Sequence, residues 1–193
     1  MTSPTLDLRS AFAAIANTLS EEKIAHAFIG ALPVLAWGRV RATTDIDVVV
    51  VVEDNWERLS AALKALGVEQ HKQIGPADET DSLPDVAVFY TSGDSPVRID
   101  VFIAKTQFEQ AVVATARHAT ALDVSVRLAR PEASIIYKLL AQRRRDLDDI
   151  DGIFEARRIA NDPLDWRFLE HWSAEWGIED RLAPYRVRYG PSE

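Results

Sequence analysis

The feature that most constrains the fold is a run of five valines that follows two closely spaced aspartates. Residues 45–52 read DIDVVVVV, and a continuous β-branched run is typical of a central strand that is covered on both faces. Asp45 and Asp47 lead into this run and are two residues apart, so both project from the same face of the strand. Because an ionised carboxylate beside a core is costly unless it is paired or bound to a metal, these acids need a specific partner.

A third aspartate repeats this pattern. Residues 97–103 read VRIDVFI, which places Asp100 among apolar residues in a second predicted strand. If that strand lies beside residues 45–52, three carboxylates converge on one face of the sheet. Their mutual repulsion raises their pKa values unless a cation compensates, and oxygen ligands in this number suit Mg²⁺ or Mn²⁺. We therefore interpret Asp45, Asp47 and Asp100 as metal ligands.

A purely structural interpretation of the same acids is also open. In that interpretation Asp45 simply begins its strand, while Asp47 and Asp100 pair with arginines such as Arg41 and Arg98. Carboxylates that are paired in this way need no metal. The aspartates alone do not decide between the two interpretations.

A single glycine marks a second candidate contact. Residues 24–30 predict a short buried strand and residues 31–38 a short helix, with Gly30 at the junction. Such a junction lets backbone N–H groups approach a phosphate at the positive end of the helix. A plain tight turn explains the glycine equally well.

The remaining pattern alternates helices and strands before it becomes helical. Further helices are predicted at residues 5–19, 55–66 (capped by Asp54), 106–117, 131–144, 146–160 and 164–176. A further strand is predicted at residues 121–129, and turn residues join strand 85–91 to strand 97–103 in a hairpin, whereas residues 68–84 are predicted as a loop. The pattern therefore indicates a mixed α/β half over residues 1–130 and a helical half over residues 131–193.

Composition narrows the classes of function. The 193-residue chain has 22 basic and 30 acidic side chains, and its net charge of −8 argues against a protein that coats DNA or an anionic membrane. It has no cysteine, which excludes disulfides and cysteine-type zinc sites. We expect a cytoplasmic protein, because the sequence shows neither a secretory signal nor an apolar stretch long enough to cross a bilayer.

The acids and the glycine belong to a longer motif. Gly30 followed by the string Gly38-x-x-Arg41-x-Thr43-x-Asp45-x-Asp47 resembles the nucleotidyltransferase superfamily related to DNA polymerase β. Within it, the chain is most similar to the small bacterial proteins of the abortive-infection toxin–antitoxin group and to the minimal nucleotidyltransferases. The later segments that share the resemblance are residues 98–102 (RIDVF), residues 137–141 (YKLLA) and Arg145-Asp146 with Asp149. The resemblance implies a mixed sheet of about five strands flanked by helices, with a helical segment packed on this core.

The resemblance also implies a reaction and roles for individual residues. It implies transfer of a nucleoside monophosphate from a nucleoside triphosphate such as ATP to a hydroxyl acceptor, with Mg²⁺ or Mn²⁺ as the metal. Asp45 and Asp47 would bridge two metal ions, and Asp100 would bind one of them and accept the hydroxyl proton. The residues that the resemblance places at the nucleotide are Gly30, Ala31, Arg41, Thr43 and Lys138. A salt bridge to nearby acids is an equal interpretation of Arg41, and a solvated helix face is the alternative for Lys138.

The sequence leaves the acceptor open. A small molecule, a tRNA 3′ end and a protein side chain all carry suitable hydroxyls, although the acidic net charge disfavours a large RNA. A second class of function is a catalytically silent module of the toxin–antitoxin type, which uses the same fold to bind a protein partner. Stabilisation by Mg²⁺ and a nucleoside triphosphate discriminates between them, because a ligand that binds only the native state raises the unfolding midpoint.

Overall fold

The computed structural model describes residues 6–52, 55–75 and 83–191. The chain divides into two compact units. The first unit comprises Met1–Leu32 and Ala42–Ala129, and the second comprises Pro33–Arg41 and Arg130–Glu193. The sheet belongs to the first unit, and the second unit is helical.

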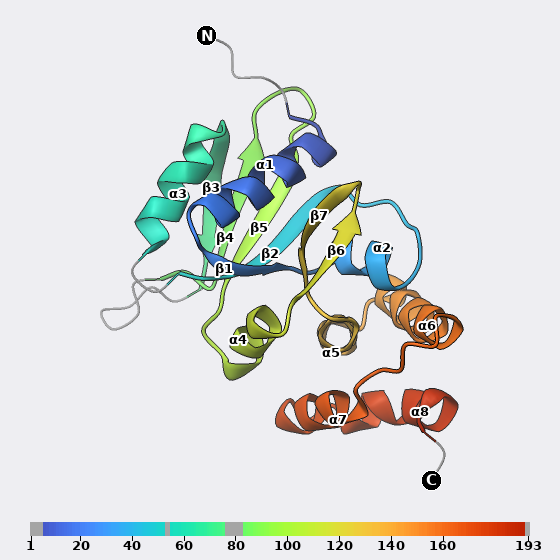
Figure 1. Ribbon diagram of the computed structural model, residues 1–193. Helices are drawn as coiled ribbons and strands as arrows, with labels where there is room; N and C mark the ends of the chain where they lie inside the picture. Colours follow the sequence, from blue (N-terminus) through green and yellow to red (C-terminus); the bar gives the residue numbers. More distant parts are fainter. Residues whose placement is uncertain (1–5, 53–54, 76–82, 192–193) are drawn as a thin grey trace. The chain divides into compact units, whose positions relative to one another are not determined.

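A seven-stranded mixed sheet forms the centre of the first unit (Figure 1). Its strands, in the order β3-β4-β5-β2-β1-β7-β6, are β1 (Ala25–Phe28), β2 (Asp45–Val51), β3 (Val68–Ile74), β4 (Val86–Thr91), β5 (Arg98–Ile103), β6 (Arg117–Ala121) and β7 (Val124–Leu128). β2 pairs in parallel with β5, and β1 pairs in parallel with β7, while the other neighbours are antiparallel. The predicted mixed α/β class is confirmed, with seven strands in place of about five.

The valine run lies at the middle of this sheet. β2 is the fourth of the seven strands, between β5 and β1. Val48, Val49 and Val50 are fully buried, and because successive side chains alternate between faces, apolar residues cover β2 on both sides. The prediction of a central strand from the sequence is therefore confirmed.

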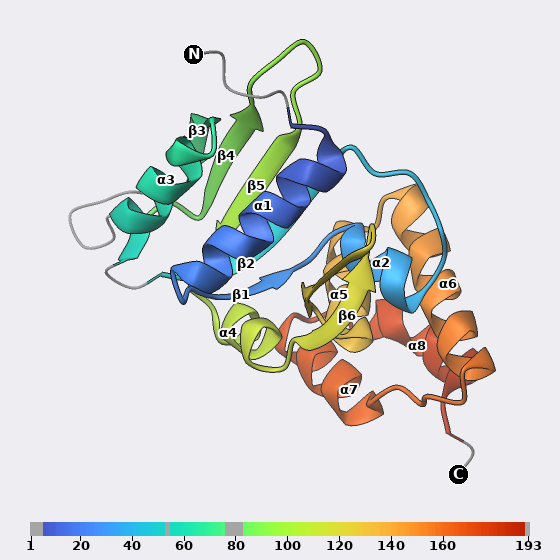
Figure 2. The same ribbon diagram turned by 45° about the horizontal axis from the view of Figure 1, so that its top comes forward.

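Among the described residues of the first unit, three helices are present: α1 (Leu8–Glu21), α3 (Trp56–Ala65) and α4 (Gln107–Ala114). Figure 2 shows α1 lying across one face of the sheet, and the side chains that it buries include Phe12 and Ile15. Asp7 caps α1 by accepting a hydrogen bond from the backbone of Ser10, which satisfies one of the free N–H groups of the first turn. Asp54, the predicted cap of the helix at residues 55–66, lies outside the described residues.

Two strands of the sheet depart from the sequence prediction. Residues 68–84 were predicted as a loop, but β3 occupies Val68–Ile74 as an edge strand paired with β4. Its side chains are mostly exposed, so the apolar alternation that marks a half-buried strand is missing. β6 was not predicted: it lies between the predicted helix 106–117 and the predicted strand 121–129, and it pairs with β7 through a tight turn at Leu122 and Asp123, both with positive φ.

The second unit contains most of α2 (Leu32–Trp37) and four further described helices. These are α5 (Pro131–Ala141), α6 (Arg144–Ile159), α7 (Trp166–Glu175) and α8 (Glu179–Tyr189). The predicted helices at residues 131–144, 146–160 and 164–176 correspond to α5, α6 and α7, whereas α8 was not predicted. α8 carries Pro184 in its interior and Leu182 is its buried residue, so its sequence lacks an apolar stripe. Among the described helices, none is long and apolar enough to span a membrane.

Candidate active site

The three aspartates come together on one face of the sheet because β2 and β5 are parallel neighbours. In their register, Asp47 lies opposite Asp100, and Asp45 lies opposite Arg98. Side chains two residues apart on a strand share a face, so Asp45, Asp47, Arg98 and Asp100 all lie on the same face. The convergence of the three acids was conditional on the strand at 97–103 pairing with the valine strand, and the structure meets that condition.

Asp100 already has an ionic partner on its own strand. The Nε atom of Arg98 donates a hydrogen bond to Oδ1 of Asp100 at 2.8 Å, and the Asp100 side chain is 12% exposed against 47% for Arg98. This hydrogen bond is the main reason why the pKa of the Arg98 guanidinium lies above its ordinary value, and the charge of Asp45 adds to the same effect. The structure therefore contains the ion pair between Asp100 and Arg98 that the structural interpretation of the sequence expects.

Asp45 is oriented by a neighbouring hydroxyl. The Oγ1 atom of Thr43 donates to Oδ1 of Asp45 at 2.9 Å and lies 3.2 Å from the backbone oxygen of the same residue. Thr43 was predicted to contact the nucleotide, and in the structure its hydroxyl holds the Asp45 carboxylate. A carboxylate fixed in this way keeps its second oxygen in a defined direction.

Gly30 lies directly against Asp47. It follows β1 with φ of +70°, a conformation that favours glycine. A Cβ atom built on Gly30 would overlap Oδ2 of Asp47 and lie 2.8 Å from its Cγ, while the backbone N–H of Ile29 donates to the backbone oxygen of Asp47 at 2.9 Å. The glycine therefore makes room for the carboxylate, and the following Ala31 is buried. Gly30 thus borders the face of β2 and β5 that carries Asp45, Asp47 and Asp100, which we call the carboxylate face.

The two cations predicted at the nucleotide lie in the second unit, and both contact Asp149. Lys138 Nζ lies 2.7 Å from Oδ2 of Asp149 and 3.4 Å from Oδ1 of Asp146. Arg41 Nε lies 3.3 Å from Oδ2 of Asp149, and Arg39 Nε lies 3.2 Å from Oδ1. We call this group of residues the Asp149 cluster. Arg41 is thus in a salt bridge, and Lys138 is buried on α5 rather than on the solvated face considered for it.

The sequence reasoning noted Asp146 and Asp149 but missed their burial and their pairing with Lys138. Asp146 and Asp149 are 1% and 0% exposed, and their spacing of three on α6 puts them on one side of the helix. Burial by itself would raise the pKa of Asp146, but the hydrogen bond from Arg143 and the charge of Lys138 outweigh it and hold that pKa below its ordinary value. The signal in the sequence was the pair of acids at this spacing, eight and eleven residues after Lys138.

The donor set of the carboxylate face suits a hard divalent cation. It offers carboxylate oxygens from two adjacent strands, the ligand type that Mg²⁺ and Mn²⁺ prefer, and Gly30 leaves room for one of them. Within residues 6–52, 55–75 and 83–191, however, no three acidic or imidazole side chains are close enough to form a metal centre. The carboxylate face therefore offers oxygen ligands of the type that Mg²⁺ and Mn²⁺ prefer, while the Asp100 carboxylate is bound to Arg98.

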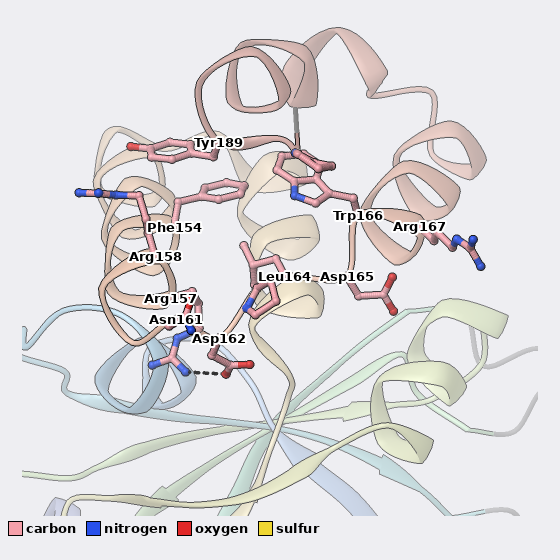
Figure 3. Close-up of a pocket in the computed structure, with 12 residues that line it drawn as sticks. Phe154, Arg157, Arg158, Asn161, Asp162, Leu164, Asp165, Trp166, Arg167 and Tyr189 are labelled. Atoms are coloured by element: carbon pink, nitrogen blue, oxygen red, sulfur yellow. Dashed lines mark hydrogen bonds and ion pairs between the residues drawn. The ribbon is translucent and has the colours of Figure 1, made fainter. Parts of the chain in front are cut away.

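A cavity of about 610 Å³ lies in the second unit (Figure 3). Its walls include Phe154, Trp166 and Tyr189, and the Phe154 ring stacks on Tyr189 and Trp166 at centroid distances of 4.7 and 5.6 Å. The Arg157 guanidinium lies 3.0 Å from the Asp162 carboxylate at this cavity. None of the residues predicted at the active site lines it.

Comparison with known proteins identifies the fold of the chain. No protein-family model and no curated protein sequence matches the chain. Among solved structures, the chain is similar to a nucleotidyltransferase-like protein from Paracoccidioides brasiliensis, with a TM-score of 0.57 and 18% identity over 95% of this chain and 93% of that one. The chain has the nucleotidyltransferase fold. The resemblance of the motif string to this superfamily is thus confirmed at the level of the fold.

Two further structures share this nucleotidyltransferase fold. The antibiotic-resistance factor ANT(2″)-Ia matches with a TM-score of 0.57 and 18% identity, over 93% of this chain and 95% of that one. The lincosamide antibiotic adenylyltransferase LnuA, bound to lincomycin, matches with a TM-score of 0.53 and 13% identity, over 78% of this chain and 98% of that one. The similarity spans nearly the whole of each of these proteins.

Proposed function

We propose that the protein is a metal-dependent nucleotidyltransferase that moves a nucleoside monophosphate from a nucleoside triphosphate to a hydroxyl acceptor. The observation that carries the proposal is the placement of Asp45, Asp47 and Asp100 on one face of two parallel strands in a nucleotidyltransferase fold. The close approach of Gly30 to Asp47 supports the proposal, because a side chain at position 30 would overlap the Asp47 carboxylate.

In the proposed reaction the acceptor oxygen attacks the α-phosphorus of the triphosphate. A new bond forms between that oxygen and the α-phosphorus, and the bond from the α-phosphorus to the bridging oxygen breaks, so that pyrophosphate leaves. The Asp100 carboxylate accepts the hydroxyl proton, and Asp45 and Asp47 are the residues that would hold the divalent cations. When bound, Mg²⁺ or Mn²⁺ supplies charge neutralisation at the phosphates and lowers the pKa of the acceptor hydroxyl.

The remaining site residues act on the triphosphate in this proposal. We propose that the backbone N–H groups of Gly30 and Ala31, which follow β1 next to Asp47, donate to phosphate oxygens. Thr43 orients Asp45. Phosphate contacts by Arg41 and Lys138 require these cations to exchange their bonds with Asp149 for phosphate oxygens, because both are paired with that acid in the structure.

A small-molecule hydroxyl is the acceptor that we favour over a tRNA end or a protein side chain. The net charge of −8 disfavours a polyanionic acceptor. ANT(2″)-Ia is an antibiotic-resistance factor, and LnuA is an adenylyltransferase with bound lincomycin. Both support a small acceptor for a chain of this fold and length.

The position of the radiolabel on the triphosphate tests the proposal. Purified protein is incubated with a cell extract and ATP, GTP, CTP or UTP that carries ³²P at either the α or the γ position. We expect label to pass to an acceptor from the α position alone, since nucleotidyl transfer releases the γ-phosphate with pyrophosphate. The Asp45→Asn/Asp47→Asn variant should transfer none, whereas Asp123→Asn, at an exposed acid of the same unit, should match the wild type.

Two results would count against the proposed nucleotidyltransferase activity. Equal transfer by the wild type and by the double variant would remove these carboxylates from the site. Absence of transfer, together with no rise in melting temperature with Mg²⁺ or Mn²⁺ and any of the four triphosphates, would favour the catalytically silent toxin–antitoxin module. The bond between Arg98 and Asp100 is the observation that favours that second function, because it occupies the third carboxylate.

A further inference from the structure

Arg98 is the cation that shares a face with all three carboxylates of the proposed site. It lies opposite Asp45 in the register of β2 and β5 and two residues before Asp100 on its own strand. Its Nε atom is 2.8 Å from Oδ1 of Asp100. Its positive charge therefore lies within the field of the carboxylates that we propose as metal ligands.

We propose that Arg98 is a positioning residue that exchanges Asp100 for the triphosphate when the divalent cation binds. The inference rests on the proposed function. A cation held by Asp100 competes with the guanidinium for the same carboxylate and repels its charge. Once released, the guanidinium is a planar fork of donors that matches phosphate oxygens two at a time. One residue thus keeps Asp100 in place before the cation arrives and binds the substrate afterwards.

The geometry makes this exchange inexpensive. The Arg98 side chain is 47% exposed, and ion pairs of such exposure typically change an equilibrium only about 1.4- to 5-fold. A guanidinium that is half in solvent also needs no rearrangement of the core to turn away from Asp100. The Asp149 cluster offers the contrast, because its Lys138 is 6% exposed and its Asp149 is fully buried.

If the exchange occurs, removing Arg98 should change the affinities for two ligands in opposite directions. In the Arg98→Met variant, we expect Mn²⁺ alone to bind about 2- to 5-fold more tightly, because the competing cation is gone. The same variant should bind the Mn²⁺ complex of α,β-methylene ATP about tenfold more weakly or worse, because charge-assisted hydrogen bonds to phosphate are lost. Electron paramagnetic resonance of free Mn²⁺ measures the first affinity, and titration calorimetry with the non-cleavable nucleotide measures the second. Arg98→Gln serves as a second variant with the same expected signs.

A matched control comes from another exposed ion pair of the first unit. Arg58 pairs with Glu22 at 3.0 Å and is 54% exposed, so Arg58→Met should leave both affinities unchanged. Affinities for Mn²⁺ that are unchanged or weaker in both Arg98 variants overturn the exchange, and so does an unchanged affinity for the Mn²⁺–nucleotide complex. In those cases, binding of both ligands by the wild type leaves the proposed function standing. Failure of the wild type to bind Mn²⁺ overturns the exchange and the metal-dependent function together.

Discussion

The two units of the molecule each gather acids and bases, yet they do so in opposite ways. The carboxylate face of the first unit has three acids, of which Asp100 is held by the half-exposed Arg98. The Asp149 cluster of the second unit surrounds one fully buried acid with Lys138, Arg39 and Arg41. An acid that is enclosed by cations stabilises the fold only while its partners remain. An acid with surplus negative charge around it is suited to bind a cation. We infer from the contrast that the balance of charge, more than the residue type, distinguishes a structural cluster from the functional site that we propose.

The largest effect on stability should come from breaking the Asp149 cluster. Asp149→Ala leaves the buried Lys138 ammonium with a weaker partner, which should lower the free energy of unfolding by about 3–5 kcal/mol. Urea denaturation measures the change. The adjacent Asp148→Asn is the control, because Asp148 is 61% exposed and lies 3.8 Å from Arg39, and it should cost about 1 kcal/mol or less. Similar losses in the two variants would contradict the contrast.

Substitution of Gly30 should have the next largest effect on the free energy of unfolding. Comparison with a second glycine separates backbone strain from steric overlap with Asp47. Gly30→Ala introduces a Cβ at φ of +70° and against the Asp47 carboxylate, so we expect a loss of about 1–3 kcal/mol together with loss of nucleotidyl transfer. Gly177→Ala is the matched control, because its φ is +60° but no atom lies within 4 Å of the added Cβ. It should cost about 1 kcal/mol, from the backbone alone. Transfer that survives in Gly30→Ala would show that Asp47 needs no such close approach.

Lowering the pH should reduce the contribution of Asp146 to the free energy of unfolding. The pKa of its carboxyl lies below the ordinary value in the folded chain, so its contribution to stability is present above the unfolded pKa and is lost as the pH falls through the folded one. The difference in unfolding free energy between wild type and Asp146→Asn should therefore shrink as the pH drops below about 4. Urea denaturation at pH 3 to 7 measures it. A difference that stays constant over this range would contradict the assignment.

The smallest effect on stability should come from the acids that we expect to matter most for activity. Asp45→Asn/Asp47→Asn removes like charges from one face of a strand, so we expect the free energy of unfolding to change by less than about 1 kcal/mol or to rise. Thermal and urea denaturation in buffer with EDTA measure this. A loss comparable to that of Asp149→Ala would mean that these carboxylates are structural.

The parts of the fold that follow from sequence are those where burial leaves a pattern. The valine run predicts β2, and the apolar run at 97–103 predicts the strand that carries Asp100. That this strand lies beside β2 was a condition of the site hypothesis, and the structure meets it. β3 and α8 left no such pattern, because β3 is an exposed edge strand and α8 buries little besides Leu182. The partners of the candidate residues were harder to predict. The contact of Arg39 with Asp149 joins residues 110 positions apart, and only the tertiary structure decides which acids each arginine meets.

The most direct test of the central claim is anomalous X-ray scattering from crystals grown with Mn²⁺ and α,β-methylene ATP. We expect a manganese peak within ligand distance of Asp45, Asp47 and Asp100, with the α-phosphate beside it and the Arg98 guanidinium turned from Asp100 to the phosphates. A nucleotide bound elsewhere without manganese at these aspartates, and Asp100 still on Arg98, would contradict it.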